Sequence, residues 1–286
     1  MLKDNPRGEY IINQYKPPFC YELAGQKFVI AMEDGHDYTL NFLDKKTVEW
    51  NLDSDAPKAE YYECLKGDDT TYLVTFEIEG TELRTNHTFV LDLENMLVTR
   101  IIGKIGENPK FPFLNNTYFE FGAIYREDGT TEFRRHSFTS DMIGTVMQWT
   151  YGEQMVTVHA YYTTNFYRIT YPRELALERQ QEEMDEMVHL MPSSDEPAVY
   201  VKIKPNMYLV SITERNMEKI LNGQVKYRCN TMCFLQNYDR LYQVGRTFGT
   251  LSEGDKIIPL HLMFGAVGKF TEVEKEFVEA PNPFTT

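Results

Sequence analysis

Short segments in which apolar and polar residues alternate, separated by turn signals, make up most of this sequence. Alternation with a period of two is typical of β-strands, because successive side chains of a strand point to opposite faces. In the first part of the chain these segments are residues 23–32, 38–42, 47–50, 59–65, 71–78, 87–92 and 97–104. The first two are joined through Asp34-Gly35, a strong hairpin signal. Short strands at such close spacing predict an antiparallel barrel or sandwich.

The same plan occurs twice along the chain. Leu23-Ala-Gly25 precedes strand, turn and strand in the first half, and Ile143-Gly144 does so in the second. Tyr72-Leu-Val-Thr likewise corresponds to Tyr208-Leu-Val-Ser. A repeat at this scale predicts two copies of one barrel. We expect an N-terminal barrel over residues 1–113 and a C-terminal barrel over residues 114–286, with a Pro-rich linker at 107–113 and a bridging hairpin at 118–137.

Residues 172–190 carry the one convincing helical pattern of the sequence. Pro172 suits the first turn of a helix, and Pro192 stands beyond its end. We expect this helix to be inserted between two strands of the second barrel, where it acts as a lid or a brace across the barrel mouth. Its many charges are most simply explained as a solvated face.

The charge balance restricts the partners of the protein. Acidic residues outnumber basic ones by 43 to 29, a net charge of -14, which argues against binding to nucleic acid or anionic membranes. No stretch approaches the roughly 18 apolar residues of a membrane span, and the N-terminus shows no signal peptide. We therefore expect a soluble, cytoplasmic protein.

No motif indicates a metal or a cofactor. The four cysteines form no Cys-x-x-Cys pair, and the six histidines lack metal-ligand spacing. The sequence has no Gly-rich phosphate loop, no Gly-x-Ser-x-Gly elbow and no His-Glu-x-x-His. We expect reduced, mostly buried thiols, no metal and no cofactor.

The strongest candidate for a chemical site lies in the second half. Tyr208, Val210, Ile212 and Glu214 share one face of a strand, because they are spaced by two residues. If that face points into a barrel, Glu214 is a carboxylate in an aromatic pocket, which suits it to proton transfer. The alternative is a glutamate at a strand end in solvent, the commoner place for this residue type.

Other polar and aromatic residues could complete such a site. Trp149 and Tyr151 lie on one face of another strand, where they could contact a ligand or serve only as core aromatics. Arg168 could pair with an anionic ligand or with surface acids, and Arg173 is the competing choice. His136, flanked by two arginines, is a further candidate, although a hydrogen-bonded structural role is commoner for histidine.

Three segments resemble the two-part MoaF proteins, over nearly the whole chain. They are Leu-Ala-Gly-Gln-Lys-Phe from residue 23, Asp-Gly-His-Asp-Tyr from residue 34 and Gln-Val-Gly-Arg-Thr-Phe-Gly from residue 243. That family is often associated with molybdenum cofactor synthesis, but the sequence shows no pterin or molybdate site. Each half also resembles phenolic acid decarboxylases, which are cofactor-free enzymes built on a calycin, or lipocalin-like, barrel.

The second half carries the closer resemblance to the decarboxylases. Trp149-Thr-Tyr151 stands where those enzymes have a tyrosine pair, and Ser211-Ile-Thr-Glu214 matches their glutamate-bearing strand. Tyr167-Arg168-Ile169 matches the strand before their catalytic arginine, for which Arg173 is the nearest candidate. We take Glu214, Tyr151 and Arg173 as candidate catalytic residues, and Trp149, Arg168, Tyr208 and His136 as candidate substrate-binding residues.

The first half lacks these groups. Ile30 and Met32 stand at the tyrosine positions, and Ile78 stands at the glutamate position. We therefore expect the N-terminal barrel to be structural, or shaped for an apolar ligand.

The resemblance favours a cofactor-independent lyase or isomerase that acts on a small aromatic, phenolic acid inside the C-terminal barrel. The alternative is a non-catalytic, lipocalin-like binder of a small apolar metabolite. A third reading is an assembly protein whose barrels pack into a homo-oligomer. Turnover of a substrate would distinguish the enzyme from the other two hypotheses. Binding of a small ligand would distinguish the binder from the assembly protein.

Overall fold

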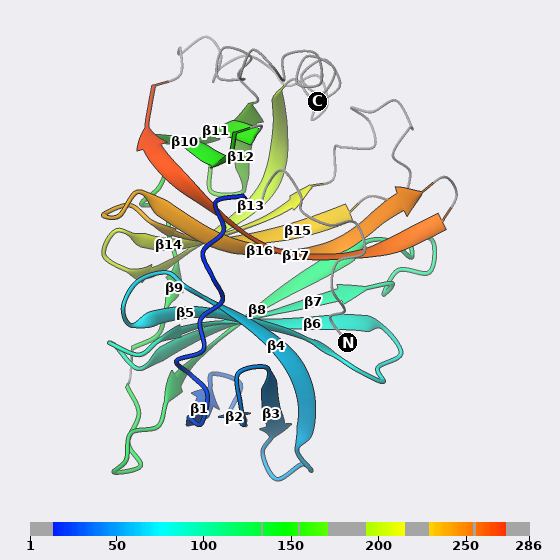
Figure 1. Ribbon diagram of the computed structural model, residues 1–286, viewed down its shortest axis with the longest axis vertical. Helices are drawn as coiled ribbons and strands as arrows, with labels where there is room; N and C mark the ends of the chain where they lie inside the picture. The colour runs from blue at the N-terminus through cyan, green and yellow to red at the C-terminus, as the bar shows by residue number, and fades with distance from the viewer. Residues whose placement is uncertain are drawn as a thin grey trace. The chain divides into compact units, whose positions relative to one another are not determined.

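The computed structural model is built from β-strands (Figure 1). It describes residues 14–132, 134–153, 155–170, 193–214, 229–253 and 256–272. Within these ranges every regular element is a strand, and the strands form two closed antiparallel barrels of eight strands each. The prediction of an all-β chain with two barrels in tandem is therefore confirmed.

Strands β1 to β8 form the first barrel, coloured from blue to green in Figure 1. Each strand pairs with the next, and β1 pairs with β8 to close the ring. The strands are β1 (Lys27–Met32), β2 (Asp37–Phe42), β3 (Thr47–Leu52), β4 (Lys58–Lys66), β5 (Thr71–Ile78), β6 (Arg84–Asp92), β7 (Leu97–Ile105) and β8 (Asn115–Ile124). Their bounds agree with the alternating segments of the sequence to within a few residues.

Strands β10 to β17 form the second barrel, coloured from green to red in Figure 1. Pairing of β10 with β17 and of β12 with β13 completes its ring. The strands are β10 (Thr145–Gly152), β11 (Met155–Tyr161), β12 (Phe166–Thr170), β13 (Ser193–Lys204), β14 (Met207–Glu214), β15 (Cys229–Asn237), β16 (Tyr242–Glu253) and β17 (Lys256–Phe270). The short strand β9 (Ser137–Phe138) lies beside β13.

The division between the two units differs from the expected boundary after residue 113. Strand β8 pairs with β1, so it closes the first barrel, although the sequence placed it at the start of the second. Among the described residues, 18–112 and 116–137 form the first compact unit, and 14–17, 113–115 and 138–272 form the second. Hydrogen bonding across the ring decides this assignment, and alternation along one strand does not reveal it. The helix expected at 172–190 lies outside the described residues.

Period-two alternation gives each barrel its apolar core. In the first barrel Tyr38, Leu40 and Phe42 of β2 are fully buried in one cluster, and Ile30 and Met32 of β1 belong to it. In the second barrel the corresponding cluster contains Met147, Trp149, Tyr151, Tyr161, Tyr167, Tyr208, Val210, Ile212, Phe234 and Phe264. Side chains of one parity therefore fill each barrel, and those of the other parity lie on its outer face.

Glycines of the second barrel make room for its large aromatic rings. A Cβ atom on Gly268 of β17 would lie 2.6 Å from Cζ3 of Trp149, its cross-strand partner on β10. At Gly245 of β16 a Cβ atom would lie 2.6 Å from the carbonyl oxygen of Cys233 and closer still to the Phe264 ring. These two positions accept only glycine without a shift of their neighbours.

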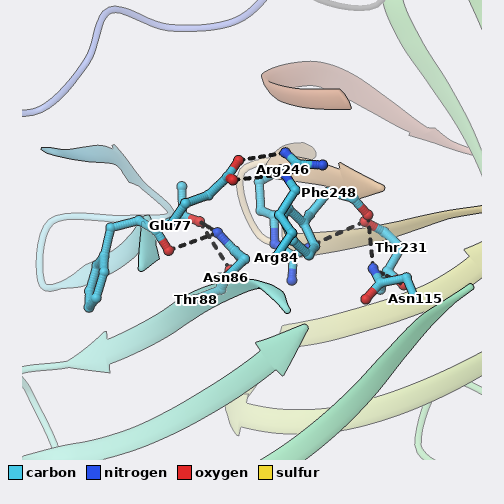
Figure 2. A network of polar contacts seen from close by, with 10 residues as sticks. Glu77, Arg84, Asn86, Thr88, Asn115, Thr231, Arg246 and Phe248 are labelled. Atoms are coloured by element: carbon cyan, nitrogen blue, oxygen red, sulfur yellow. Dashed lines mark hydrogen bonds and ion pairs between the residues drawn. The ribbon is translucent and has the colours of Figure 1, made fainter. Parts of the chain in front are cut away.

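Polar residues on the outer faces are held by hydrogen bonds within each unit (Figure 2). In the first unit Arg84 forms a bidentate ion pair with Glu77, with N–O distances of 2.6 and 2.8 Å. In the second unit the Asn115 amide donates to Thr231 Oγ1 and to the carbonyl oxygen of Phe248, both at 2.9 Å. Such bonds satisfy polar groups that the strands bury.

We expect Gly245→Ala to lower the free energy of unfolding by about 1 to 3 kcal/mol, because the new methyl group overpacks the barrel against Phe264. Thr247→Val on the same strand and face is the matched control. It removes a buried hydroxyl that has no hydrogen-bond partner among the described residues, so it should be neutral or slightly stabilising. Urea denaturation of both variants measures the difference. Equal stability of Gly245→Ala and the wild type would contradict the packing described above.

Candidate functional site

A chain of hydrogen bonds between uncharged side chains crosses the interior of the second barrel. Gln243 Nε2 donates to the hydroxyl of Tyr151 at 2.8 Å, and Gln236 Nε2 donates to Gln243 Oε1 at 3.0 Å. Gln236 Nε2 also donates to the hydroxyl of Tyr161 at 2.7 Å, and that hydroxyl donates to Gln236 Oε1 at 3.1 Å. The Tyr151 hydroxyl is therefore held by the amide of Gln243 on β16, which the amide of Gln236 on β15 holds in turn.

The chain continues to a buried histidine on β11. His159 Nδ1 lies 3.3 Å from the Tyr161 hydroxyl, and His159 Nε2 lies 2.9 Å from Thr157 Oγ1. Burial lowers the pKa of His159 to about 3, because the charged imidazolium would be stripped of water inside the barrel. His159 is therefore neutral at physiological pH, with one ring nitrogen donating and the other accepting.

Two carboxylates lie inside the same barrel on adjacent strands. Glu214 of β14 is 4% exposed and shares the inward face with Tyr208, Val210 and Ile212. Glu196 of β13 is 1% exposed and pairs with Tyr167, a core residue of β12. The paired register of β13 and β14 ends at Ala198 and Ile212, and Glu196 and Glu214 each lie two residues beyond that last pair.

Each of these carboxylates has a polar neighbour. The Ser194 hydroxyl donates to Glu196 Oε1 at 2.6 Å, and Asn230 Nδ2 lies 3.5 Å from Glu214 Oε2. Asn230 pairs with Glu214 in register on β15. The site thus offers two carboxyl groups, a hydroxyl and an amide at one end of strands β13 to β15.

The structure brings some of the predicted site residues together and separates others. Trp149, Tyr151 and Tyr208 are all buried in the core cluster of the second barrel. Tyr208 pairs with Gln236, so it lies in register with the hydrogen-bonded chain that holds Tyr151. Glu214 pairs with Asn230, three inward positions further along β14. The predicted residues therefore form two groups along the strands.

Arg168 differs from its expected place in the interior. It alternates with Tyr167 and Ile169, which take inward positions in the core, so its side chain lies on the outer face. There its Nε and Nη2 atoms donate to the two carboxylate oxygens of Asp195 at 2.7 and 3.0 Å. Tyr162 lies beside this pair, and burial with the nearby Asp195 raises the pKa of its hydroxyl to about 12. Because side chains alternate between the two faces of β12, Arg168 points away from the interior of this barrel and from any ligand bound there.

His136 also differs from its expected place, because it belongs to the first unit. Its Nδ1 atom lies 2.8 Å from Thr99 Oγ1, and its Nε2 atom lies 3.7 Å from Asp92. The histidine is 2% exposed, and its surroundings are those of a hydrogen-bonded structural residue, which was the alternative to a binding role. Arg173, the candidate catalytic arginine, lies outside the described residues.

The first barrel is similar in sequence to a known protein family. Residues 10–107 match the sequence model of the MoaF N-terminal domain. The first barrel is MoaF-like. The match ends just after β7, so it does not extend to the second barrel, and the resemblance to phenolic acid decarboxylases stays a prediction. No curated protein matches the chain.

The MoaF-like barrel contains a charged cluster that the sequence analysis missed. Arg100 of β7 pairs with the core residue Phe89 across the strands, which places it on the inward face. Its guanidinium donates to Glu120 of β8 at 2.9 Å and to Nε2 of His87 at 3.2 Å. His87 Nδ1 lies 2.9 Å from the hydroxyl of Tyr38. One feature of the sequence could have predicted this cluster. Arg100 is a charged residue at an inward-facing position of a strongly apolar strand, between Val98 and Ile102.

The described residues give no sign of a metal centre or of a membrane-spanning helix. Among them no group of three or more His, Cys, Asp or Glu side chains is placed to hold a metal ion. The same residues contain no helix that is long and apolar enough to cross a membrane. All four cysteines are buried and outside any disulfide.

We expect the stability of the second barrel to fall in acid because of His159. Its folded pKa of about 3 lies below the unfolded value near 6.5, so the unfolded chain takes up the proton first. Stability is therefore fully present above about pH 6.5 and declines by roughly 1.4 kcal/mol per pH unit below it, until the folded state also protonates. Urea denaturation between pH 7 and pH 4.5 measures this slope.

His159→Gln should reduce that slope, because glutamine keeps polar atoms at the site without titrating. His36→Gln is the control, since His36 is exposed and the adjacent Asp53 raises its pKa. Because that shift is opposite in sign to the shift of His159, His36→Gln should not reduce the decline of stability in acid. An unchanged slope in His159→Gln would show that the buried imidazole does not couple folding to pH.

Proposed function

We propose that the second barrel binds a small aromatic acid and that Glu214 transfers a proton to or from it, as a cofactor-independent lyase or isomerase. Two buried carboxyl groups carry this proposal. They belong to Glu196 and Glu214, which take inward-facing positions on the adjacent strands β13 and β14. Two carboxyl groups at one site can divide the work of general acid and general base. A calycin-like fold of the second barrel would agree with a ligand site in its interior.

The remaining groups would orient the substrate. In this proposal Glu214 exchanges the proton, and the Ser194 and Asn230 groups hold the two carboxyl groups in place. Tyr151 would contact the ligand from its inward position, with its hydroxyl held by a hydrogen bond from Gln243 Nε2. Arg168 has no role in this proposed mechanism, because its ion pair with Asp195 lies on the outer face of the barrel. Arg173 stays the candidate partner for a substrate carboxylate.

A second candidate function is non-catalytic binding of a small apolar metabolite. The chain of Tyr151, Gln243, Gln236 and Tyr161 favours it, because these neutral groups bond mainly to one another. A binder needs only shape and a few fixed polar groups, which such a chain would supply. Ligand would then stabilise the fold without formation of a product.

Glu214→Gln tests the proposal against a panel of hydroxycinnamates and related phenolic acids. Glutamine has nearly the same shape but cannot transfer the proton, so we expect turnover to fall by roughly 10²- to 10⁴-fold. Substrate affinity should change much less. Product formation is followed by chromatography, and affinity by calorimetry on both proteins.

Glu153→Gln is the matched control, because Glu153 lies exposed in the turn after β10. It should keep full activity. Full activity in Glu214→Gln would exclude the proposed proton transfer. Ligand-induced stabilisation of the wild type with no turnover of any compound would favour the binding function.

A further inference from the structure

We infer that the MoaF-like barrel holds a second ligand site, which binds an uncharged aromatic molecule through its carbonyl oxygen. Three hydrogen-bond donors on three strands carry the inference: the Tyr38 hydroxyl, the Trp50 indole N–H and the Arg100 Nε–H. All three belong to side chains on inward-facing positions of β2, β3 and β7. The site is independent of the carboxyl pair in the second barrel.

The tautomer of His87 determines what the Tyr38 hydroxyl can do. Arg100 can only donate, so His87 Nε2, 3.2 Å from Arg100 Nη2, must accept. His87 is neutral because burial, and next Arg100, lower its pKa well below the usual range. Its single proton therefore lies on Nδ1 and is donated to the Tyr38 hydroxyl at 2.9 Å. The phenolic hydrogen of Tyr38 is left for another acceptor.

The cluster is therefore rich in donors and poor in acceptors. Burial raises the pKa of Tyr38, so its hydroxyl keeps the proton that it can donate. The Trp50 Nε1 and Arg100 Nε atoms are buried and have no hydrogen-bond partner in the described part of the chain. Buried donors without acceptors are costly in a native protein, and a ligand oxygen would satisfy them.

Aromatic rings surround these donors. The ring of Tyr38 stacks on Trp50 with a centroid distance of 5.5 Å and an interplanar angle of 4°, and the Arg100 guanidinium lies 4.4 Å from its centroid. Phe76 and Phe89 complete the wall, with their ring centroids 5.9 Å apart. A planar aromatic ligand matches walls of this kind, because offset and edge-to-face contacts are favourable between rings.

The charges of the cluster favour a neutral ligand. Glu120 already balances Arg100 at 2.9 Å. A second inward-facing carboxyl group, Glu60, is 6% exposed, and burial raises its pKa. Lys58 lies over the Trp50 ring at 5.5 Å. A carboxylate ligand would add an unbalanced negative charge near Glu120 and Glu60, whereas a ketone or amide oxygen accepts the hydrogen bonds without adding charge.

The cluster is open to solvent at one edge. The side chain of Glu120 is 27% exposed, and that of Arg100 is 11% exposed. Both are on inward-facing positions, so water reaches this part of the interior, and a ligand could enter by the same route. Tyr38, by contrast, is fully buried.

The two tryptophans of the chain make a direct test available, since Trp50 lies in the first barrel and Trp149 in the second. Nitrogen-15 correlation spectra of the full chain show one indole N–H signal for each, and Trp149→Phe assigns the remaining signal to Trp50. The probes are acetophenone, ethylbenzene and benzoate. Acetophenone should move the Trp50 indole proton downfield in a saturable titration, because the N–H gains an acceptor. Ethylbenzene and benzoate should each bind at least about tenfold more weakly.

Tyr38→Phe removes one donor and keeps the ring, so it should weaken acetophenone binding about tenfold. Tyr62→Phe is the matched control, because its hydroxyl donates to the backbone oxygen of Asp44 within the same barrel. It should leave the affinity unchanged. The dispersion of each spectrum shows that the variant is folded.

Three outcomes would overturn the inference. They are an unmoved Trp50 signal at saturating acetophenone, equal binding of ethylbenzene, and tighter binding of benzoate than of acetophenone. A shift confined to Trp149 would place the ligand in the second barrel and would also reject this site. Activity of the Glu214 site is measured separately, so failure of one proposal leaves the other standing.

Discussion

Closure of each strand ring by backbone hydrogen bonds is the constraint on which the rest of this protein depends. Once β1 pairs with β8, and β10 with β17, no strand edge is left inside the ring. The inward side chains are then cut off from water, except at the ends of the barrel. Any polar group placed there must bond to another side chain or to a ligand. The inward polar residues are for this reason the most informative part of both barrels.

The two barrels meet this constraint with different chemistry. The second barrel uses neutral groups, Tyr151, Gln243, Gln236 and Tyr161, which exchange hydrogen bonds along a chain. The MoaF-like barrel uses an ion pair and an imidazole, and the N–H groups of Trp50 Nε1 and Arg100 Nε have no acceptor in the described structure. Two barrels of the same strand number therefore have chemically different interiors.

Much of the fold could be predicted from the sequence because the signal is local. Alternation determines which residues share a face: it puts Trp149 and Tyr151 on one face of their strand, and both lie in the core cluster of the second barrel. The same rule puts Arg168 on the opposite face from Tyr167, a consequence that the family resemblance obscured. The resemblance to the decarboxylases did not predict the polar cluster of the MoaF-like barrel, because Ile30, Met32 and Ile78 at the compared positions are apolar. The inward parity of Arg100 would have revealed it.

The sequence by itself determined the strands, their inward faces and the existence of two barrels, because period two and turn residues act over a few positions. Only the tertiary structure decided which strands close each ring. Pairing between β8 and β1 joins residues far apart in the chain, and no local pattern encodes it. The same holds for Glu214 with Asn230, and for Arg100 with Glu120 and His87. Their proximity follows from register across strands, which is set only when the barrel is complete.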